Sequence, residues 1–214
     1  MKPRKSYGRF MTVVVMAALL LVTALAPGAL AQRGRPTRPP TTPPPPPPPP
    51  PPPSYNAADR EFVEMMIPHH YQALLMSQMA PARSNNAELR ALASRIDVEQ
   101  GLEISMMQGW QSTNGLPVTN AQMAYEHMLQ MPEMLEAMGM ATPAEMSALS
   151  ASSGAAFDRL YLELMIEHHN GAVDMLVHVL SHGQDTNLQF WATDMLTAQS
   201  IQIWQMEQML AEMT

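Results

Sequence analysis

The stretch MMIPHHYQALLM at residues 65–76 returns as LMIEHHNGAVDM at residues 164–175, and this repetition decides the fold. The two histidine pairs, at 69–70 and 168–169, are separated by 168 − 69 = 99 residues. The same offset holds without a gap for Asp59/Asp158, Phe62/Tyr161, Glu64/Glu163, Met66/Met165, Ala73/Ala172, Met76/Met175, Gln100/Gln199, Ile104/Ile203 and Met107/Met206. An unbroken offset of this length indicates two copies of one structural unit.

Each copy is predicted to form two helices, because apolar residues recur at helical spacing and prolines and glycines fall between the segments. The predicted helices cover residues 57–80, 86–110, 121–138 in the connection between the copies, either 142–180 or 153–180, and 186–214. Pro68 lies inside the first of them and predicts a bend or a restart just before the first histidine pair.

No segment shows the alternating pattern of a β-strand. Residues 57–214 are therefore predicted to form one all-α domain, a four-helix bundle of two αα-hairpins related by a pseudo-twofold axis. Repeat 1 spans 57–115 and repeat 2 spans 151–214, joined by a partly helical crossover at 116–150.

The N-terminal segment has the pattern of a secretory signal peptide. Lys2, Arg4, Lys5 and Arg9 precede an apolar run, and Ala-Leu-Ala at 29–31 offers a cleavage site. Residues 1–31 are predicted to be removed, which places the protein in the periplasm or outside the cell. The alternative is that the run of about 17 apolar residues is retained as a membrane anchor.

Residues 32–56 form a predicted proline-rich linker with eleven consecutive prolines at 43–53. Such a run favours the extended polyproline II helix, about 34 Å long at about 3.1 Å per residue. It is interpreted as a stiff spacer, the alternative being a ligand for a proline-binding module.

The domain after residue 54 holds 5 arginines, no lysine and all 19 acidic residues, so its formal charge is 5 − 19 = −14. This charge excludes nucleic acid as a partner and is compatible with cations, although a solubilising surface has the same composition.

The chemistry of the repeated motif points to a soft metal ion. Carboxylate-bridged di-iron bundles present Glu-x-x-His, whereas this chain has Met-x-x-His, at 66–69, 165–168 and 175–178. Thioether sulfur and imidazole nitrogen suit Cu(I) and Ag(I), while Fe, Mn, Mg and Ca prefer oxygen. The chain has no cysteine, and methionine remains available as a ligand where an exported thiol would be oxidised.

The sequence therefore predicts copper, with Cu(I) favoured, as the bound ion. The predicted nitrogen ligands are His69, His70, His168 and His169, and the predicted sulfur ligands are Met66, Met76, Met165 and Met175. Further candidates are Met107 and Met206, and His178 and His182, which continue the stripe of His168 and Met175 along one helical face and would extend the second site. In the crossover, His127 shares one predicted helical face with Met123, Met131, Met134 and Met138. This face is either a surface copper site or a hydrophobic strap over the bundle.

Three interpretations remain open at this point. The first is a non-enzymatic protein for copper sequestration or transfer, with a copper-delivery or efflux protein as partner. The second is a metallo-oxidase of the ferritin-like class, in which Glu64, Glu163 and Glu167 would supply carboxylates. The third is a structural or interaction module whose methionines only fill the core, since methionine is a good core residue.

The motif resembles the bacterial family known as domain of unknown function 305. The shared residues are Phe62, Met66-Ile67, His69-His70, Ala73 and Met76, followed by Gln100, Glu103-Ile104, Met107 and Trp110. The resemblance covers about residues 58–213 and implies a ferritin-like four-helix bundle. It also implies a relation to periplasmic copper-binding proteins linked to copper tolerance.

The second copy departs from the motif at two positions. Gln202 stands where the first copy has Glu103, and the tryptophan has moved to Trp204. A carboxylate that would orient a ligating histidine is therefore expected to be missing in the second copy, so that the two halves bind metal unequally.

Overall fold

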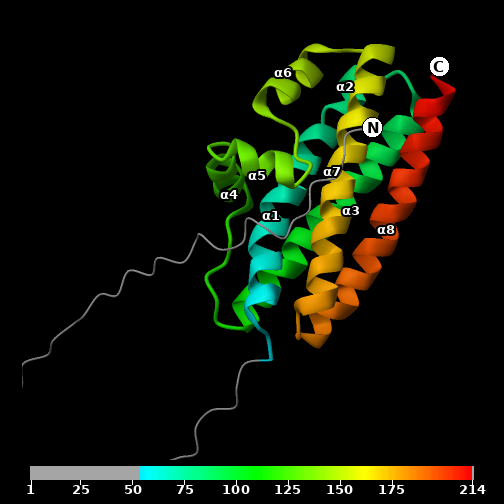
Figure 1. Ribbon diagram of the computed structural model, residues 1–214. Helices are drawn as coiled ribbons and strands as arrows, with labels where there is room; N and C mark the ends of the chain where they lie inside the picture. The colour runs from blue at the N-terminus through cyan, green and yellow to red at the C-terminus, as the bar shows by residue number, and fades with distance from the viewer. Residues whose placement is uncertain (1–53, 214) are drawn as a thin grey trace, which may run out of the picture. The chain divides into compact units, whose positions relative to one another are not determined.

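The computed structural model describes residues 54–213, and these residues form an all-α structure (Figure 1). The predicted signal peptide and the proline run lie outside the described residues, so both stay predictions. No helix within 54–213 is both long and apolar enough to cross a membrane.

Four long helices make the bundle. They are α1 (Ala57–Ser77), α3 (Ala87–Thr113), α7 (Ala155–His182) and α8 (Thr186–Glu212). Helices α1 and α3 form the first hairpin and α7 and α8 the second, and α1 packs against α7 to join them (Figure 1). The prediction of a four-helix bundle built from two repeated hairpins is confirmed.

The connecting segments contain four short helices. They are α2 (Ala80–Arg83), α4 (Ala121–Met128), α5 (Pro132–Ala137) and α6 (Pro143–Ala151). The expectation of one continuous helical face from Met123 to Met138 was wrong, because the chain breaks before Pro132, whose ring begins a new helix. The longer alternative for the fourth predicted helix was also wrong, since α6 and α7 are separate.

Polar side chains fix the beginnings of three of the four long helices, and α7 begins after Gly154 without a side-chain cap. Asn56 and Asp59 form a capping box at α1, Asn86 caps α3, and Asp185 caps α8. Helix α1 continues through Pro68 without interruption, so the helix does not restart there. Pro68 is buried, and packing of α1 against α3, α7 and α4 offsets the backbone hydrogen bond that proline cannot make.

The buried carboxylate of Asp59 also ties the first repeat to the second. It accepts hydrogen bonds from the backbone N–H groups of Asn56, Gln184 and Asp185. The side-chain amide of Asn56 in turn donates to the backbone carbonyl of His182 at 2.7 Å. The start of α1 is thus bound to the α7–α8 turn, which makes α1 and α7 antiparallel neighbours.

The crossover strap (residues 121–141) lies across α1 and α7. Gln72 on α1 makes two hydrogen bonds to the backbone of Ala141, at 2.7 and 2.8 Å. At Gly139 and Gly171 the backbones of the strap and α7 meet so closely that a Cβ atom on either glycine would overlap the other backbone. Gly139 also has a positive φ of 66°, which favours glycine.

Replacing Gly171 by alanine should destabilise the fold by about 1–3 kcal/mol, because the new methyl group must displace the carbonyl of Met138. Urea unfolding followed by circular dichroism measures this. The matched control is Gly109→Ala, where a Cβ meets nothing within 4 Å and helix propensity predicts a gain of up to about 1 kcal/mol. Equal unfolding midpoints for the two variants would contradict the close contact between strap and helix.

Candidate metal centre

Four buried histidines meet in the middle of the bundle, where α1 crosses α7. This four-histidine centre consists of His69 and His70 from α1 and His168 and His169 from α7, each 0% exposed. The rings of His69 and His168 lie 3.7 Å apart between centroids, at an interplanar angle of 32°. Because these two residues are equivalent in the repeat, their rings lie on the pseudo-twofold axis.

The Nε2 atom of each of these histidines has an acceptor. His69 Nε2 donates to the Met138 carbonyl at 3.1 Å, and His168 Nε2 donates to the His69 carbonyl at 2.9 Å. His70 Nε2 lies 2.7 Å from the Glu103 carboxylate. His169 Nε2 lies 2.8 Å from Oε1 of Gln202. Carbonyl and carboxylate oxygens only accept hydrogen bonds, so each Nε2 carries a hydrogen.

The opposite ring nitrogen, Nδ1, has no hydrogen-bond partner in any of the four histidines. With Nε2 protonated and the ring neutral, Nδ1 presents a bare lone pair. Leaving a buried polar atom unpaired costs about 1–3 kcal/mol, so four such atoms in one place require an explanation. Metal-binding histidines have this arrangement, with one nitrogen held by an acceptor and the other directed at the metal.

Burial keeps three of these rings neutral, those of His69, His168 and His169. It lowers the pKa of His69 and of His168 well below the ordinary value, and the neighbouring histidines lower both further. Burial lowers the pKa of His169 to about 4, although its hydrogen bond to Gln202 acts in the opposite direction. Neutral imidazole is the form that binds metal ions, so the centre is ready for a ligand at neutral pH.

The second copy orients its histidine with an amide in place of a carboxylate. Gln202 accepts from His169 and donates from Nε2 to the Glu99 carboxylate at 2.6 Å. As expected, no carboxylate contacts His169 directly, but Gln202 takes its place as the orienting partner. A carboxylate is still present, but it acts through Gln202 and comes from α3 of the other repeat. The two halves differ, since His70 contacts its carboxylate directly.

The predicted sulfur ligands are buried, and methionines from different repeats come together in the core. Met76, Met165 and Met206 belong to one apolar cluster, which combines α1 with α7 and α8. Their repeat equivalents, Met175, Met66 and Met107, hold the matching core positions on the other side of the pseudo-twofold axis, and all six are at most 6% exposed. We refer to these two sets as the methionine triads. Sequence spacing placed Met66 and Met76 together, whereas the antiparallel packing of α1 and α7 separates them.

The remaining predicted ligands lie apart from the buried centre. His178 and His182 stack on each other near the C-terminal end of α7, with ring centroids 4.3 Å apart, and His182 is exposed. His127 is exposed on α4 one turn after Met123, which is 67% exposed. The predicted single stripe from His168 to His182 is thus wrong, because the last turn of α7 reaches the surface.

The carboxylates proposed as ligands of an oxidase lie on the surface. Glu64, Glu163 and Glu167 are exposed, and the carboxylate in contact with a histidine is Glu103. Across residues 54–213, no group of three or more His, Asp and Glu side chains is arranged to hold a metal ion. As these side chains are arranged, a metal ion at the four-histidine centre would have at most two of the histidines as ligands, and its other ligands would be of another type.

Sequence reasoning missed two buried polar residues beside the centre. Gln100 and Gln199 are 2% exposed, and their side chains have unpaired amide atoms, both atoms in Gln100 and Oε1 in Gln199. Each precedes by one helical turn the residue that orients a histidine, Glu103 or Gln202. The sequence did contain a signal for these two residues. They occupy the same position of the repeat on the core-facing side of a helix, and a polar residue that recurs at such a position serves a purpose other than packing.

The sequence profile of the family described as "Domain of unknown function (DUF305)" matches residues 59–210. The chain belongs to this family. A crystal structure of a DUF305 protein from Streptomyces coelicolor is 33% identical, with a TM-score of 0.63 over 73% of this chain and 93% of that one. A DUF305 fragment from Deinococcus radiodurans is 30% identical, with a TM-score of 0.66 over 75% of this chain and 99% of that one.

The protein CopM has the same fold. In its Cu(I)-bound form it is 29% identical, with a TM-score of 0.57 over 72% of this chain and 96% of that one. Structures of CopM with Ag and with Cu(II) match equally well. Comparison with functionally curated proteins gives no match. The DUF305 fold thus includes a protein that binds copper and silver.

Acidification should destabilise the protein between pH 7 and pH 5. The folded state holds the pKa of His169 at about 4, below the ordinary 6.5, so the unfolded state binds more protons in this interval and stability rises with pH. His169 alone accounts for about 2 kcal/mol between pH 7 and pH 5, and His69 and His168 act in the same direction.

Urea unfolding of the metal-free protein at the two pH values measures this loss. The exposed His127→Gln variant is the control and should keep the full pH dependence. Equal stability at pH 7 and pH 5 would show that the buried histidines are not held neutral.

Proposed function

We propose that this protein binds Cu(I), and Ag(I) by the same chemistry, inside the four-helix bundle, and that it sequesters or transfers copper. The observation that carries the proposal is the set of four unpaired Nδ1 atoms on buried histidines whose Nε2 atoms already have acceptors. The similarity to CopM in its Cu(I)-bound and Ag-bound forms supports the choice of ion.

The nitrogen ligands in this proposal are drawn from His69, His70, His168 and His169, at most two of them for one metal ion as the side chains are arranged. Their Nε2 hydrogen bonds set the tautomer before any metal arrives, so no proton has to leave the ring on binding. A bare Nδ1 that is desolvated in the apo protein also gains a partner when a metal binds. Both effects favour binding to the folded state.

The sulfur ligands come from the methionine triads. Thioethers stay uncharged, so a Cu(I) site built from methionine and neutral histidine buries only one positive charge. The acidic surface of the domain, with its formal charge of −14, attracts the cation. Cu(II) would rely on the histidine nitrogens, because thioether sulfur suits the softer Cu(I).

The cellular setting in this proposal is the periplasm or the cell exterior. It rests on the signal peptide predicted at residues 1–31, and the Streptomyces coelicolor relative has been classed provisionally as secreted. The protein would act without catalysis, receiving copper from or passing it to a delivery or efflux protein. The proline run would then be a stiff spacer that precedes the domain.

Leucine in place of Met165 should lower the affinity for Cu(I) at least tenfold, or about 1.4 kcal/mol. Leucine fills nearly the same volume and removes only the sulfur, so the fold is retained. Competition with a chromogenic Cu(I) chelator under reducing conditions measures the affinity. Met209→Leu is the matched control, because Met209 lies in the same apolar cluster outside the repeated motif. Equal losses in the two variants, or none in either, would refute the assignment of the triad.

Glutamine in place of Glu103 should weaken Cu(I) binding by about 10–100-fold, the usual effect of removing a carboxylate that orients a ligating histidine. Glu64→Gln is the control, since Glu64 is on the exposed side of α1. The same chelator competition applies. Should E103Q bind Cu(I) as tightly as E64Q, the charge of the Glu103 carboxylate would not contribute to binding, and an amide would orient His70 as Gln202 orients His169.

A further inference from the structure

Two histidines form a pair at the surface, near the C-terminal end of α7. His178 is half-buried and His182 is exposed, and their rings stack with centroids 4.3 Å apart at an interplanar angle of 21°. The two residues are one helical turn apart, the spacing at which side chains of a helix share a face. The first repeat has Met79 and Arg83 at the equivalent positions, so this pair is not part of the duplicated centre. We refer to it as the surface histidine pair.

The ring of His182 is held so that one of its nitrogens is available to a ligand. Its Nδ1 donates to the backbone carbonyl of His178 at 3.0 Å. A carbonyl only accepts hydrogen bonds, so Nδ1 carries the hydrogen and Nε2 of the neutral ring has a bare lone pair. This hydrogen bond also orients the ring, as the corresponding hydrogen bonds of histidines in metal sites do. His182 therefore presents Nε2 as a ligand atom.

The ring of His178 is neutral and close enough to share an ion with His182. Burial lowers the pKa of His178, and the neighbouring His182 lowers it further. A neutral imidazole has one nitrogen without a hydrogen. Because metal–nitrogen bonds are about 2.0–2.1 Å long, one ion can join two nitrogens that lie within about 4 Å of each other. Rings stacked with centroids 4.3 Å apart meet this condition after a small rotation of the side chains.

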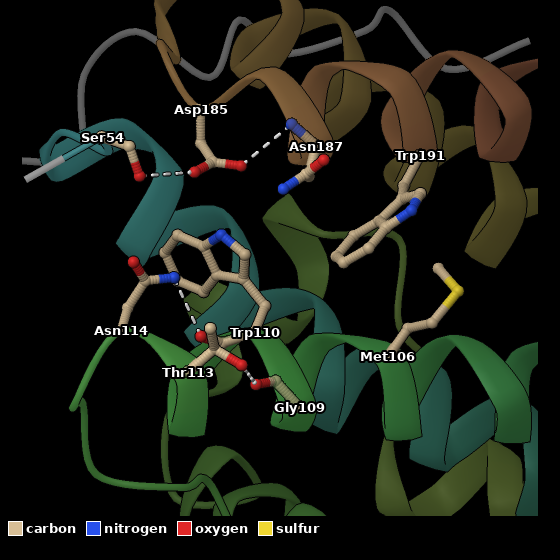
Figure 2. Close-up of a pocket in the computed structure, with 9 residues that line it drawn as sticks. All are labelled: Ser54, Met106, Gly109, Trp110, Thr113, Asn114, Asp185, Asn187 and Trp191. Atoms are coloured by element: carbon tan, nitrogen blue, oxygen red, sulfur yellow. Dashed lines mark hydrogen bonds between the residues drawn. The ribbon is translucent and has the colours of Figure 1, made fainter.

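The backbone that carries the pair is fixed, and its surroundings are negative. The side-chain amide of Asn56 holds the backbone carbonyl of His182, and the Asp59 carboxylate holds the turn that follows. Asp185 in that turn caps α8 and accepts a hydrogen bond from the Ser54 hydroxyl at 3.1 Å (Figure 2). The C-terminal end of a helix carries a partial negative charge, and here two carboxylates contact the turn beyond it. Such a position favours a cation.

The ligand atoms of the pair differ from those of the methionine triads. The six triad methionines are at most 6% exposed, whereas the surface histidine pair offers imidazole nitrogen in contact with water. Imidazole suits the divalent ions of zinc, nickel and copper, and among these the affinity is greatest for Cu(II). Within residues 54–213 no third His, Asp or Glu joins the pair, which leaves the other positions around an ion to water.

We infer that His178 and His182 form a second metal site, at the surface, which binds a divalent ion through two imidazole nitrogens and prefers Cu(II). The protein would then hold the two oxidation states of copper in different places, Cu(II) on nitrogen and water at the end of α7 and Cu(I) inside the bundle. The surface site requires no metal at the four-histidine centre.

The test adds Cu(II), without reductant, to the metal-free protein and follows the backbone NMR signals. Cu(II) is paramagnetic and broadens the signals of nearby groups, so binding at the pair should broaden those of the last turn of α7 and the α7–α8 turn. With glycine present as a competing ligand, His182→Gln should need at least about ten times more Cu(II) for the same broadening, because the second, intramolecular ligand is lost. His182 is exposed, so this variant keeps its fold.

The matched control is His127→Gln, which removes an exposed histidine from α4 and should keep the broadening at the end of α7. His178→Gln should behave as His182→Gln does, and circular dichroism checks that this variant is folded. Broadening confined to the four-histidine centre or to another part of the chain would overturn the inference, and so would broadening at the end of α7 that persists unchanged in His182→Gln. Because Cu(I) is absent, neither result decides whether the bundle binds Cu(I).

Discussion

The hydrogen bond from His168 Nε2 to the carbonyl of His69 joins the two repeats at the centre of the bundle, and the rest of the structure is organised around it. The same contact brings the two rings to 3.7 Å on the pseudo-twofold axis. His69 in turn donates a hydrogen bond from Nε2 to the Met138 carbonyl, which fixes the crossover strap over the point where α1 meets α7. Two hairpins and their connection thus converge on one pair of imidazoles.

In each of the four histidines only one ring nitrogen has a hydrogen-bond partner. Every Nε2 is held by a backbone carbonyl, a carboxylate or an amide, while every Nδ1 is unpaired. A fold selected for stability alone would replace such residues by apolar side chains, because unpaired buried polar atoms oppose folding. Methionine serves both the stability of the fold and the proposed metal binding. It packs as an apolar side chain in the metal-free protein, and its sulfur is available when a soft metal binds.

Much of the fold could be predicted from the repeat, because helical periodicity and capping residues are local. The errors have tertiary causes. Helix α1 passes through Pro68 because packing on several sides outweighs the loss of one backbone hydrogen bond. The stripe from His168 to His182 was read as one site, but burial decreases along α7 toward the surface. The missing carboxylate opposite His169 was replaced by Gln202 backed by Glu99, a pair that no single repeat contains.

The sequence by itself determined that the chain has two copies of a helical hairpin, that histidine and methionine lie on their core-facing sides, and that soft metal chemistry is favoured over carboxylate chemistry. Only the tertiary structure decided which of these residues meet. The antiparallel packing of α1 on α7 brings Met76 together with Met165 and Met206, and it leaves Met66 with the opposite side of the axis. Spacing along a helix shows which face a side chain is on, but its neighbours across the core depend on how the helices are docked.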